Sequence, residues 1–305
     1  MRAWKPVLGQ GIWIAAGLLL VAAAAAAWLL LRFVPRFTPA PELWRITPLT
    51  FLEGTGAAIM LVLAGWFGYR LLATLTLTYT LDRNGIYISW IGNRTVIPLT
   101  EVQELAVAPH AVPLPAVPHR NVGYYWGRIP LGSATPLELY TTLPPAQSTL
   151  IQTTHAIYAI APREPESFVQ EFGQRRALGV TQSLRPTFRE GRLFFSAFWN
   201  DPIIRTALLA GLATVLLLLG WLSFAYANLP PTIVLGFDAA GVAQDLRPRH
   251  QILWVPMLAI SFALLNTIIA LSIFQRMPTS ARLLQIGTVP ILVLFAVGTI
   301  MIATR

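Results

Sequence analysis

Residues that could catalyse a reaction are few in this sequence, and they form no known motif. There is no Gly-x-Ser-x-Gly nucleophile elbow, no His-Glu-x-x-His zinc motif, no phosphate-binding loop and no dinucleotide fingerprint. Cysteine is absent, which excludes disulfides and thiolate metal ligands. We therefore expect no enzymatic activity and no cofactor.

Histidine and aspartate supply two weak candidates for a metal site. His110 and His119 share a proline-rich loop that could hold a metal ion, although a loop without metal is the commoner outcome. Asp238 and Asp245 share a later polar loop, and two carboxylates without a third ligand are usually hydrated turn residues. No two histidines have the spacing of ligands on one helix face, so we expect no metal ion.

Two polar residues inside apolar runs are further candidates. Glu53 is the only acidic residue in any such run, and intramembrane acids are functional candidates by default. The alternative, which we favour, is a hydrated Glu53 at the membrane interface. Asn266, followed by Thr267, could line a path through the membrane or make hydrogen bonds between helices.

An aromatic and basic cluster is the strongest candidate for a contact surface. Tyr124, Tyr125, Trp126 and Arg128 could form a protein-binding hot spot, a membrane-interface belt or ordinary strand packing beside a turn. The preceding proline-rich stretch, Ala108 to Arg120, includes Pro113 and Pro115. It is either a Pro-x-x-Pro recognition segment or a rigid loop, and its apolar character suits contact with a membrane or partner.

The composition indicates an integral membrane protein with one polar domain. Of the 305 residues, 55% are hydrophobic and only 11% are charged, whereas soluble domains have about 25% charged residues. The net charge of +9, with Lys5 as the single lysine, indicates membrane topology and anionic lipid rather than nucleic acid.

Apolar runs divide the chain into segments. The division gives a two-helix membrane hairpin (1–74), a polar domain (75–178), a linker (179–202) and a three-helix membrane unit (203–305) with a loop at 229–250. Asp201 and Pro202 are typical of a helix start. The expected membrane spans are Gly11–Leu31, Leu49–Leu72, Ile204–Asn228, Ile252–Phe274 and Leu283–Ala303.

The basic residues favour one orientation. With five spans, most of them fall on the side that also holds the polar domain, and the positive-inside rule makes that side cytoplasmic. Arg32, Arg36 and Arg45 in the first external loop oppose this assignment. We expect a multi-pass membrane protein with a cytoplasmic polar domain.

The polar domain has the alternation of short antiparallel strands, followed by a helix over Glu164–Leu178 with Phe168 and Phe172 on one face. The predicted strands are Leu75–Leu81, Ile86–Ile91, Thr95–Pro98, Leu137–Thr142, Thr149–Thr154 and Ala156–Ala161. Tight turns at Asp82-Arg83-Asn84-Gly85 and at Gly92-Asn93-Arg94 join the first three.

This order resembles the bacterial pleckstrin-homology-like (PH-like) domains of membrane proteins. The residues that carry the resemblance include Tyr79-Thr80-Leu81, Gly85-Ile86-Tyr87, Gly123 to Arg128, Leu139 to Thr142 and Tyr158 to Pro162. The resemblance implies an α+β fold, an antiparallel β-barrel capped by a C-terminal helix, that serves as a scaffold for protein contacts. It does not imply phosphoinositide binding, and a dense Lys/Arg pocket is lacking.

A second resemblance covers Leu229 to Phe274. Leu229-Pro230, Phe237, Gly241, Asp245 and Pro256 are similar to the loop and helix of a small membrane-protein family that includes the sporulation-delay toxin immunity protein. Gly236 replaces the histidine of that pattern, and His250 stands nearest to its lysine.

The function that these features favour is a non-enzymatic scaffold or regulator in a bacterial inner membrane, such as an accessory subunit of a membrane complex. Its expected partner is a membrane or cytoplasmic protein. The alternative is a transporter or channel component, although the five spans show no inverted repeat.

Overall fold

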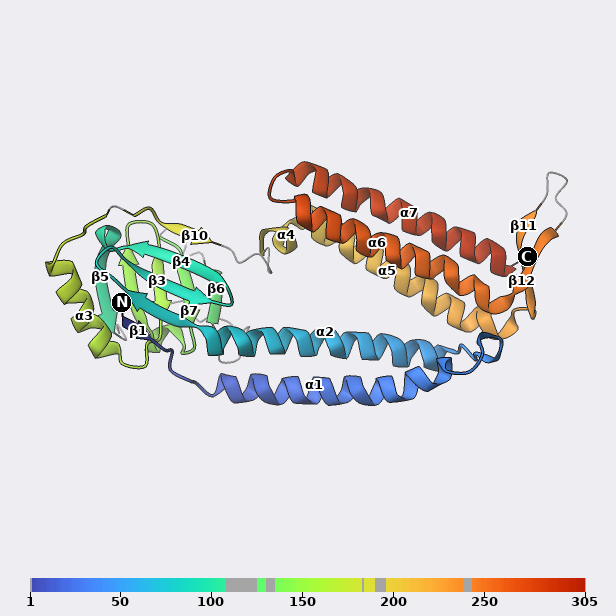
Figure 1. Cartoon of the computed structure of the whole chain (residues 1–305), viewed down its shortest axis with the longest axis horizontal. Helices are drawn as coiled ribbons and strands as arrows, with labels where there is room; N and C mark the ends of the chain where they lie inside the picture. The colour runs from blue at the N-terminus through green and yellow to red at the C-terminus, as the bar shows by residue number, and fades with distance from the viewer. Residues whose placement is uncertain are drawn as a thin grey trace. The chain divides into compact units, whose positions relative to one another are not determined.

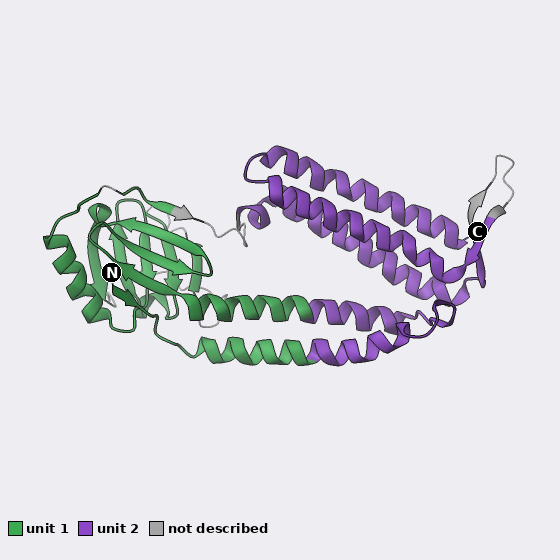
Figure 2. Ribbon diagram, in the orientation of Figure 1, with its two compact units in different colours: residues 1–24, 61–194 green, residues 25–60, 195–305 purple. Residues whose placement is uncertain are grey.

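The computed structural model describes residues 2–107, 125–129, 135–182, 184–189, 196–237 and 243–304. The chain divides into two compact units (Figure 2). One comprises residues 1–24 and 61–194, and the other comprises residues 25–60 and 195–305. The proline-rich stretch and Tyr124 lie outside the described residues, as do Asp238 and Gly241.

Within the described residues, five helices are long and apolar enough to cross a membrane, as predicted. The last helix begins at Pro278 rather than Leu283, because the polar residues before Leu283 also form helical turns. The five helices are α1 (Gly11–Phe33), α2 (Pro48–Thr76), α5 (Pro202–Ala225), α6 (Trp254–Ile273) and α7 (Pro278–Thr304) (Figure 1).

Small residues bring α1 and α2 into contact as an antiparallel pair. Ala22 and Ala26, one turn apart in the alanine run of α1, are buried. A Cβ added at Gly56 of α2 would lie 3.2 Å from Leu29 Cδ1 of α1. Gly56 therefore leaves room for the Leu29 side chain of α1.

The first sheet of the polar domain has the order β1-β2-β3-β4-β10, with antiparallel neighbours. Asp82 Oδ1 accepts hydrogen bonds from the backbone N–H groups of Asn84 and Gly85, which fixes the predicted turn between β2 and β3. The strands are β1 (Arg2–Trp4), β2 (Thr78–Leu81), β3 (Gly85–Trp90), β4 (Asn93–Pro98) and β10 (Thr187–Arg189).

The next turn differs from the predicted Gly92-Asn93-Arg94. Ile91 and Gly92 form it, with φ angles of 35° and 75°, and Asn93 already pairs with Trp90. Two residues with positive φ are what a two-residue hairpin turn requires. Ile91 is strained there because its branched side chain disfavours this conformation.

The second sheet has the order β5-β8-β9-β7-β6. Three of its strands match predicted ones to within two residues, whereas β5 and β6 come from segments without a predicted strand. The strands are β5 (Val102–Val107), β6 (Tyr125–Ile129), β7 (Leu137–Thr141), β8 (Thr149–Thr153) and β9 (Ile157–Ile160).

The expected closed antiparallel barrel is wrong for the described residues. The two sheets share no ladder there, because the chain turns through a 3₁₀ segment, Leu99–Glu101, between β4 and β5. Pro98 ends β4 and has no N–H to continue a ladder. Moreover, β7 and β9 are parallel, since the β8–β9 hairpin places β9 between β8 and β7.

Two strands from outside Leu75–Leu178 complete the first sheet. Arg2–Trp4 pairs with β2, and Thr187–Arg189 pairs with β4. Both were unpredicted, because pairing between residues so far apart leaves no periodic signal in three-residue segments. The domain thus includes the segment that leads into α1.

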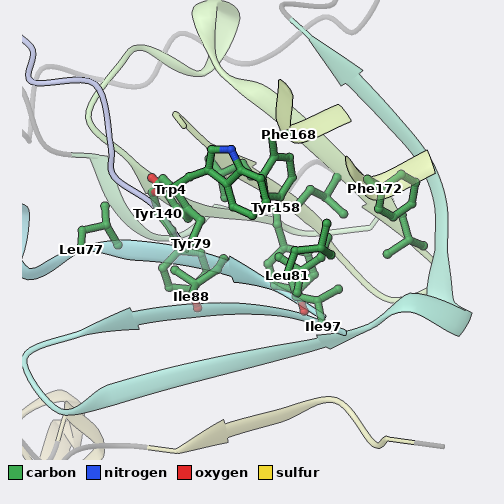
Figure 3. Close-up of a cluster of buried hydrophobic side chains, with 14 of the residues drawn as sticks. Trp4, Leu77, Tyr79, Leu81, Ile88, Ile97, Tyr140, Tyr158, Phe168 and Phe172 are labelled. Atoms are coloured by element: carbon green, nitrogen blue, oxygen red, sulfur yellow. Dashed lines mark hydrogen bonds between the residues drawn. The ribbon is translucent and has the colours of Figure 1, made fainter. Parts of the chain in front are cut away.

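Helix α3 (Pro165–Ala177) caps the main core, as predicted, with Pro165 in its first turn. Phe168 and Phe172 are buried against side chains of both sheets (Figure 3). The Trp4 ring meets the Phe168 ring edge-on with centroids 5.1 Å apart. The N-terminal strand is therefore part of the core.

The other unit contains the short α4 (Ser196–Asn200), the bundle of α5, α6 and α7, and a hairpin of β11 (Thr232–Phe237) and β12 (Ala243–Pro248). The hairpin occupies the predicted polar loop. Asp201 caps α5 as predicted, accepting from the N–H groups of Ile203 and Ile204.

Candidate functional site

Strand β6 carries three of the four residues of the predicted aromatic and basic cluster. Within the described residues it pairs only with β7, so it forms one end of the second sheet. The register places Trp126 opposite Tyr140 and Arg128 opposite Glu138. A strand at a sheet end can accept a further strand from another protein.

Alternation along β6 sends its side chains to two faces of the sheet. Tyr125 and Ile129 pack on a buried apolar cluster that includes Leu137 and Leu139. Trp126 packs on the other face, against the main core, and Arg128 is exposed. The β6 cluster therefore combines anchoring aromatic residues with one exposed cation.

Trp126 belongs to a group of aromatic rings contributed by both sheets. Its centroid lies 3.9 Å from that of Trp90 on β3 and 4.7 Å from that of Tyr140 on β7. Tyr158 on β9 stacks on Tyr140 with centroids 6.3 Å apart. The Trp126 ring therefore makes ordinary strand-packing contacts, one of the three interpretations of the cluster. These ring contacts hold β6 in place at the end of the sheet.

Hydroxyl hydrogen bonds order the same rings. The Tyr140 hydroxyl donates to Glu138 Oε2 at 3.1 Å and accepts from Thr95 Oγ1 at 3.3 Å. Burial, and next the Glu138 charge, raise the pKa of Tyr140 well above its usual value. The same causes, together with Glu101, raise the pKa of Tyr158 to about 12, against the opposing effect of Arg128. Both phenols therefore remain protonated at neutral pH.

Trp90 and Glu138 also belong to this site but were not predicted from the sequence. Trp90 ends a strand, where it resembles any apolar strand residue, and Glu138 resembles an ordinary exposed position of a half-polar strand. Only the register of β6 on β7 brings Glu138 opposite Arg128. No signal in the sequence sets that register, because the sequence on either side of β6 contains no turn motif that would align β6 with β7.

Glu53 is buried, which contradicts the favoured interpretation of a hydrated carboxylate. Its side chain is 5% exposed, and its oxygens lie 3.3 Å from Arg32 Nε and 2.7 Å from Arg36 Nη2. These are ion pairs by distance, although neither meets the angular requirement of a hydrogen bond. Arg36 also donates to Thr50 Oγ1 at 2.9 Å. The carboxylate thus joins the end of α1 to the start of α2.

Asn266 makes a hydrogen bond between helices, the second of its two interpretations. Its Nδ2 donates to Thr288 Oγ1 of α7 at 2.9 Å. Gln285 of α7, 2% exposed, donates to Thr267 Oγ1 of α6 at 3.3 Å. These groups satisfy one another, so they hold α6 on α7.

Of the weaker candidates, His110, His119 and Asp238 lie outside the described residues. His155 lies in the turn between β8 and β9, and His250 lies beside the Trp44 ring. Asp245 pairs with Arg247 at 2.6 Å. Within the described residues, no group of three His, Asp or Glu side chains could hold a metal ion.

Comparison with known protein families identifies part of the chain. Residues 77–176, about one third of the sequence, match the family described as Bacterial PH domain. The match covers the region of β2 to α3 and confirms the PH-like resemblance there, but it does not reach the C-terminal membrane unit. No curated protein and no solved structure matches the chain. The resemblance of residues 229–274 to the immunity-protein family therefore stays a prediction.

Proposed function

We propose that this protein is a non-enzymatic scaffold or regulator of a bacterial cell membrane whose PH-like domain binds a protein partner, for example as an accessory subunit of a membrane complex. The observation that carries the proposal is β6, a sheet-end strand with an exposed Arg128 and a rigid aromatic support. The partner is a membrane or cytoplasmic protein, and nucleic acid is not expected.

The geometry favours an extended segment of the partner as the bound element. A segment that adds to β6 would gain backbone hydrogen bonds at the sheet end, and an acidic side chain in it would complement Arg128. Trp126 would supply apolar area on the face that holds this charge, and Tyr125 would supply it on the other face. Aromatic and arginine side chains are those that most often dominate the energy of protein interfaces.

The proposed topology places this surface in the cytoplasm. The N-terminal strand and the end of α2 both enter the PH-like domain, so the α1–α2 hairpin leaves and re-enters the membrane on that side. Lys5 and Arg70 flank these crossings, and the positive-inside rule favours the cytoplasm for them. Arg32 and Arg36, which oppose that assignment, are paired with Glu53.

Pull-down from gentle detergent with Arg128→Gln tests the proposal. Loss of the charge should remove or weaken a partner that the unmodified chain retains, because an acidic segment loses its counter-ion. Glutamine is chosen because a carboxylate at this position would lie opposite Glu138 and destabilise the sheet. Arg185→Gln is the matched control, since Arg185 is also exposed in the PH-like unit but lies after α3.

Two results would count against the proposal. An identical partner list for both variants would exclude the β6 cluster as the contact. The absence of any retained partner, together with substrate flux in liposomes, would favour the transporter or channel alternative.

A further inference from the structure

A cavity of about 360 Å³ lies where the N-terminal segment and the end of α2 meet the PH-like domain. Its lining contains two cations, Lys5 and Arg163, and apolar side chains that include Leu8 and Leu75. Lys5 is the only lysine of the chain. Of these residues only Arg163 lies within the matched family region, so the cavity is mainly a product of the N-terminal segment.

Backbone hydrogen bonds fix the two cations opposite each other. The Arg163 N–H donates to the Lys5 carbonyl oxygen and the Val7 N–H to that of Ala161, both at 2.9 Å. Pro6 and Pro162 form an antiparallel bridge between these two bonds. Residues that face each other across such a bridge have neighbouring side chains, and like charges there repel.

Carboxylates of the described residues do not neutralise this pair. Glu164, next in sequence, lies 3.3 Å from Arg2 Nη2, and neither Lys5 nor Arg163 has an ion pair within 4.0 Å in the described part of the chain. Two exposed cations held together without a counter-ion favour an anion between them. Charge-assisted hydrogen bonds from Arg and Lys suit the oxygens of a phosphate group.

The length of α2 favours a position at the depth of lipid headgroups for the apolar part of the cavity. Leu75 is in the last turn of α2, a helix of 29 residues, whereas about 20 residues cross the hydrocarbon core. The last turns of α2 therefore extend into the headgroup region, and Leu8 precedes α1 on the same side. Leu8 and Leu75 are 61% and 51% exposed, so their side chains are free to contact the acyl chains of a lipid.

We infer that this cavity binds the phosphate of an anionic phospholipid, with the phosphate between Lys5 and Arg163 and acyl carbons against Leu8 and Leu75. A free phosphate has the same charge chemistry but no apolar tail. The inference does not depend on the proposed protein partner.

The single lysine makes the test site-specific. The full chain is reconstituted in phosphatidylcholine nanodiscs with and without phosphatidylglycerol, and acylation of Lys5 by an amine-reactive ester is followed by peptide mass spectrometry. Phosphatidylglycerol should slow the reaction about tenfold, the factor that corresponds to about 1.4 kcal/mol of binding free energy.

Arg163→Gln separates the site from a general effect of an anionic surface. The variant keeps the backbone bonds between Lys5 and Arg163 and the same membrane charge, so Lys5 should lose most of its protection. Arg185→Gln, outside the cavity, should keep it. Unchanged protection in Arg163→Gln would show that surface charge alone protects Lys5 and would overturn the site.

A third arm identifies the source of the phosphate. Inorganic phosphate added to phosphatidylcholine discs should leave the Lys5 reaction unchanged, because it lacks the apolar contacts. Protection by inorganic phosphate but not by phosphatidylglycerol would overturn the lipid assignment in favour of a free phosphate. Absence of protection in both arms would overturn the anion site altogether.

Discussion

The hydroxyl of Tyr79 on β2 donates a 2.7 Å hydrogen bond to the backbone carbonyl oxygen of Tyr140 on β7. The same hydroxyl accepts from the Ala161 N–H at 3.2 Å. One fully buried side chain thus ties the first sheet to the second and to the end of β9. Because the two sheets share no ladder within the described residues, this link contributes directly to their alignment.

Tyr79→Phe should lower the unfolding free energy of the PH-like domain by about 1–3 kcal/mol, since it leaves the Ala161 N–H buried without this partner. Thermal unfolding of the full chain in detergent, followed by tryptophan fluorescence, measures the effect. Tyr125→Phe is the control, because the Tyr125 hydroxyl makes no hydrogen bond to the described residues. Equal stability of the two variants would show that the Tyr79 link is weak.

The buried phenols predict a loss of stability at alkaline pH. The pKa of Tyr158 rises from 10.0 to about 12 on folding, so its neutral form is favoured in the folded domain. A raised folded pKa contributes stability that is complete below the unfolded pKa and is lost as pH rises from about 10 to about 12. The unfolding temperature should fall in that window. Tyr158→Phe should reduce the fall, and an unchanged pH profile would contradict the assignment.

The N-terminal strand should be necessary for a stable domain. Trp4 is 4% exposed against Phe168, and replacing a buried tryptophan with alanine costs about 3–5 kcal/mol. Trp4→Ala should therefore make α3 accessible to protease, whereas Trp13→Ala, at a site 79% exposed, should not. Trp4→Phe should be milder, because Trp4 Nε1 has no hydrogen-bond partner among the described residues. Equal resistance of Trp4→Ala and the unmodified chain would contradict this role.

The sequence predicted local elements well because their signals are local. Alternation around Tyr79 and the Asp82 turn predicted the first hairpin, and the apolar runs predicted the five long helices. Arrangements that depend on distant residues were not predictable. Trp4 and its partner strand β2 are separated in sequence by all of α1 and α2. The arginines that pair with Glu53 come from the end of α1 and from the 3₁₀ segment Val34–Phe37 that follows it.

In the candidate site, too, the residue types were predictable from the sequence and the long-range contacts were not. Residue types alone selected Trp126 and Arg128, because aromatic and basic side chains together favour contacts. The partners Tyr140 and Glu138 follow from the register of β6 on β7, which no turn motif specifies. The passage of the chain from β4 into the second sheet after Pro98 was likewise not predicted, because it depends on tertiary packing.

Asp201 and Arg282 connect the start of α5 to the first turns of α7. Arg282 Nη2 and Nε lie 2.7 and 2.9 Å from Asp201 Oδ2, while Oδ1 caps α5. The hydrogen bond from Arg282 is the main reason why the pKa of Asp201 lies below its usual 3.8. This contribution to stability is present above about pH 3.8 and is lost as pH falls through the lower folded value.

Asp201→Ala should remove both roles, and loss of the helix cap alone costs about 0.5–2 kcal/mol. Asp201→Asn should keep the cap but lose the charge, so it should be intermediate and should show less loss of stability in acid. Thermal unfolding between neutral pH and about pH 3 measures both. If Asp201→Asn is as unstable as Asp201→Ala, the Arg282 contact matters more than the cap.

Glu53 should determine whether the α1–α2 hairpin stays closed at the end where α1 connects to α2. Glu53→Gln keeps the shape of the side chain but removes the charge between Arg32 and Arg36. Breaking a buried pair costs about 3–5 kcal/mol, and the cost should be near the lower value because the Arg32 side chain is 49% exposed and can rehydrate. Because the chain has no cysteine, a Leu29→Cys and Gly56→Cys pair can report the closed hairpin by thiol cross-linking.

Cross-linking should slow in Glu53→Gln and remain unchanged in Glu42→Gln, since Glu42 is exposed and has no ion pair in the described residues. Arg36→Gln should slow it more than Arg32→Gln, because Arg36 is the closer of the two and also holds Thr50. If instead Glu53→Gln cross-links at the rate of the unmodified pair, then the apolar and small residues between the helices suffice. Glu53 would then serve only to offset part of the positive charge of Arg32 and Arg36.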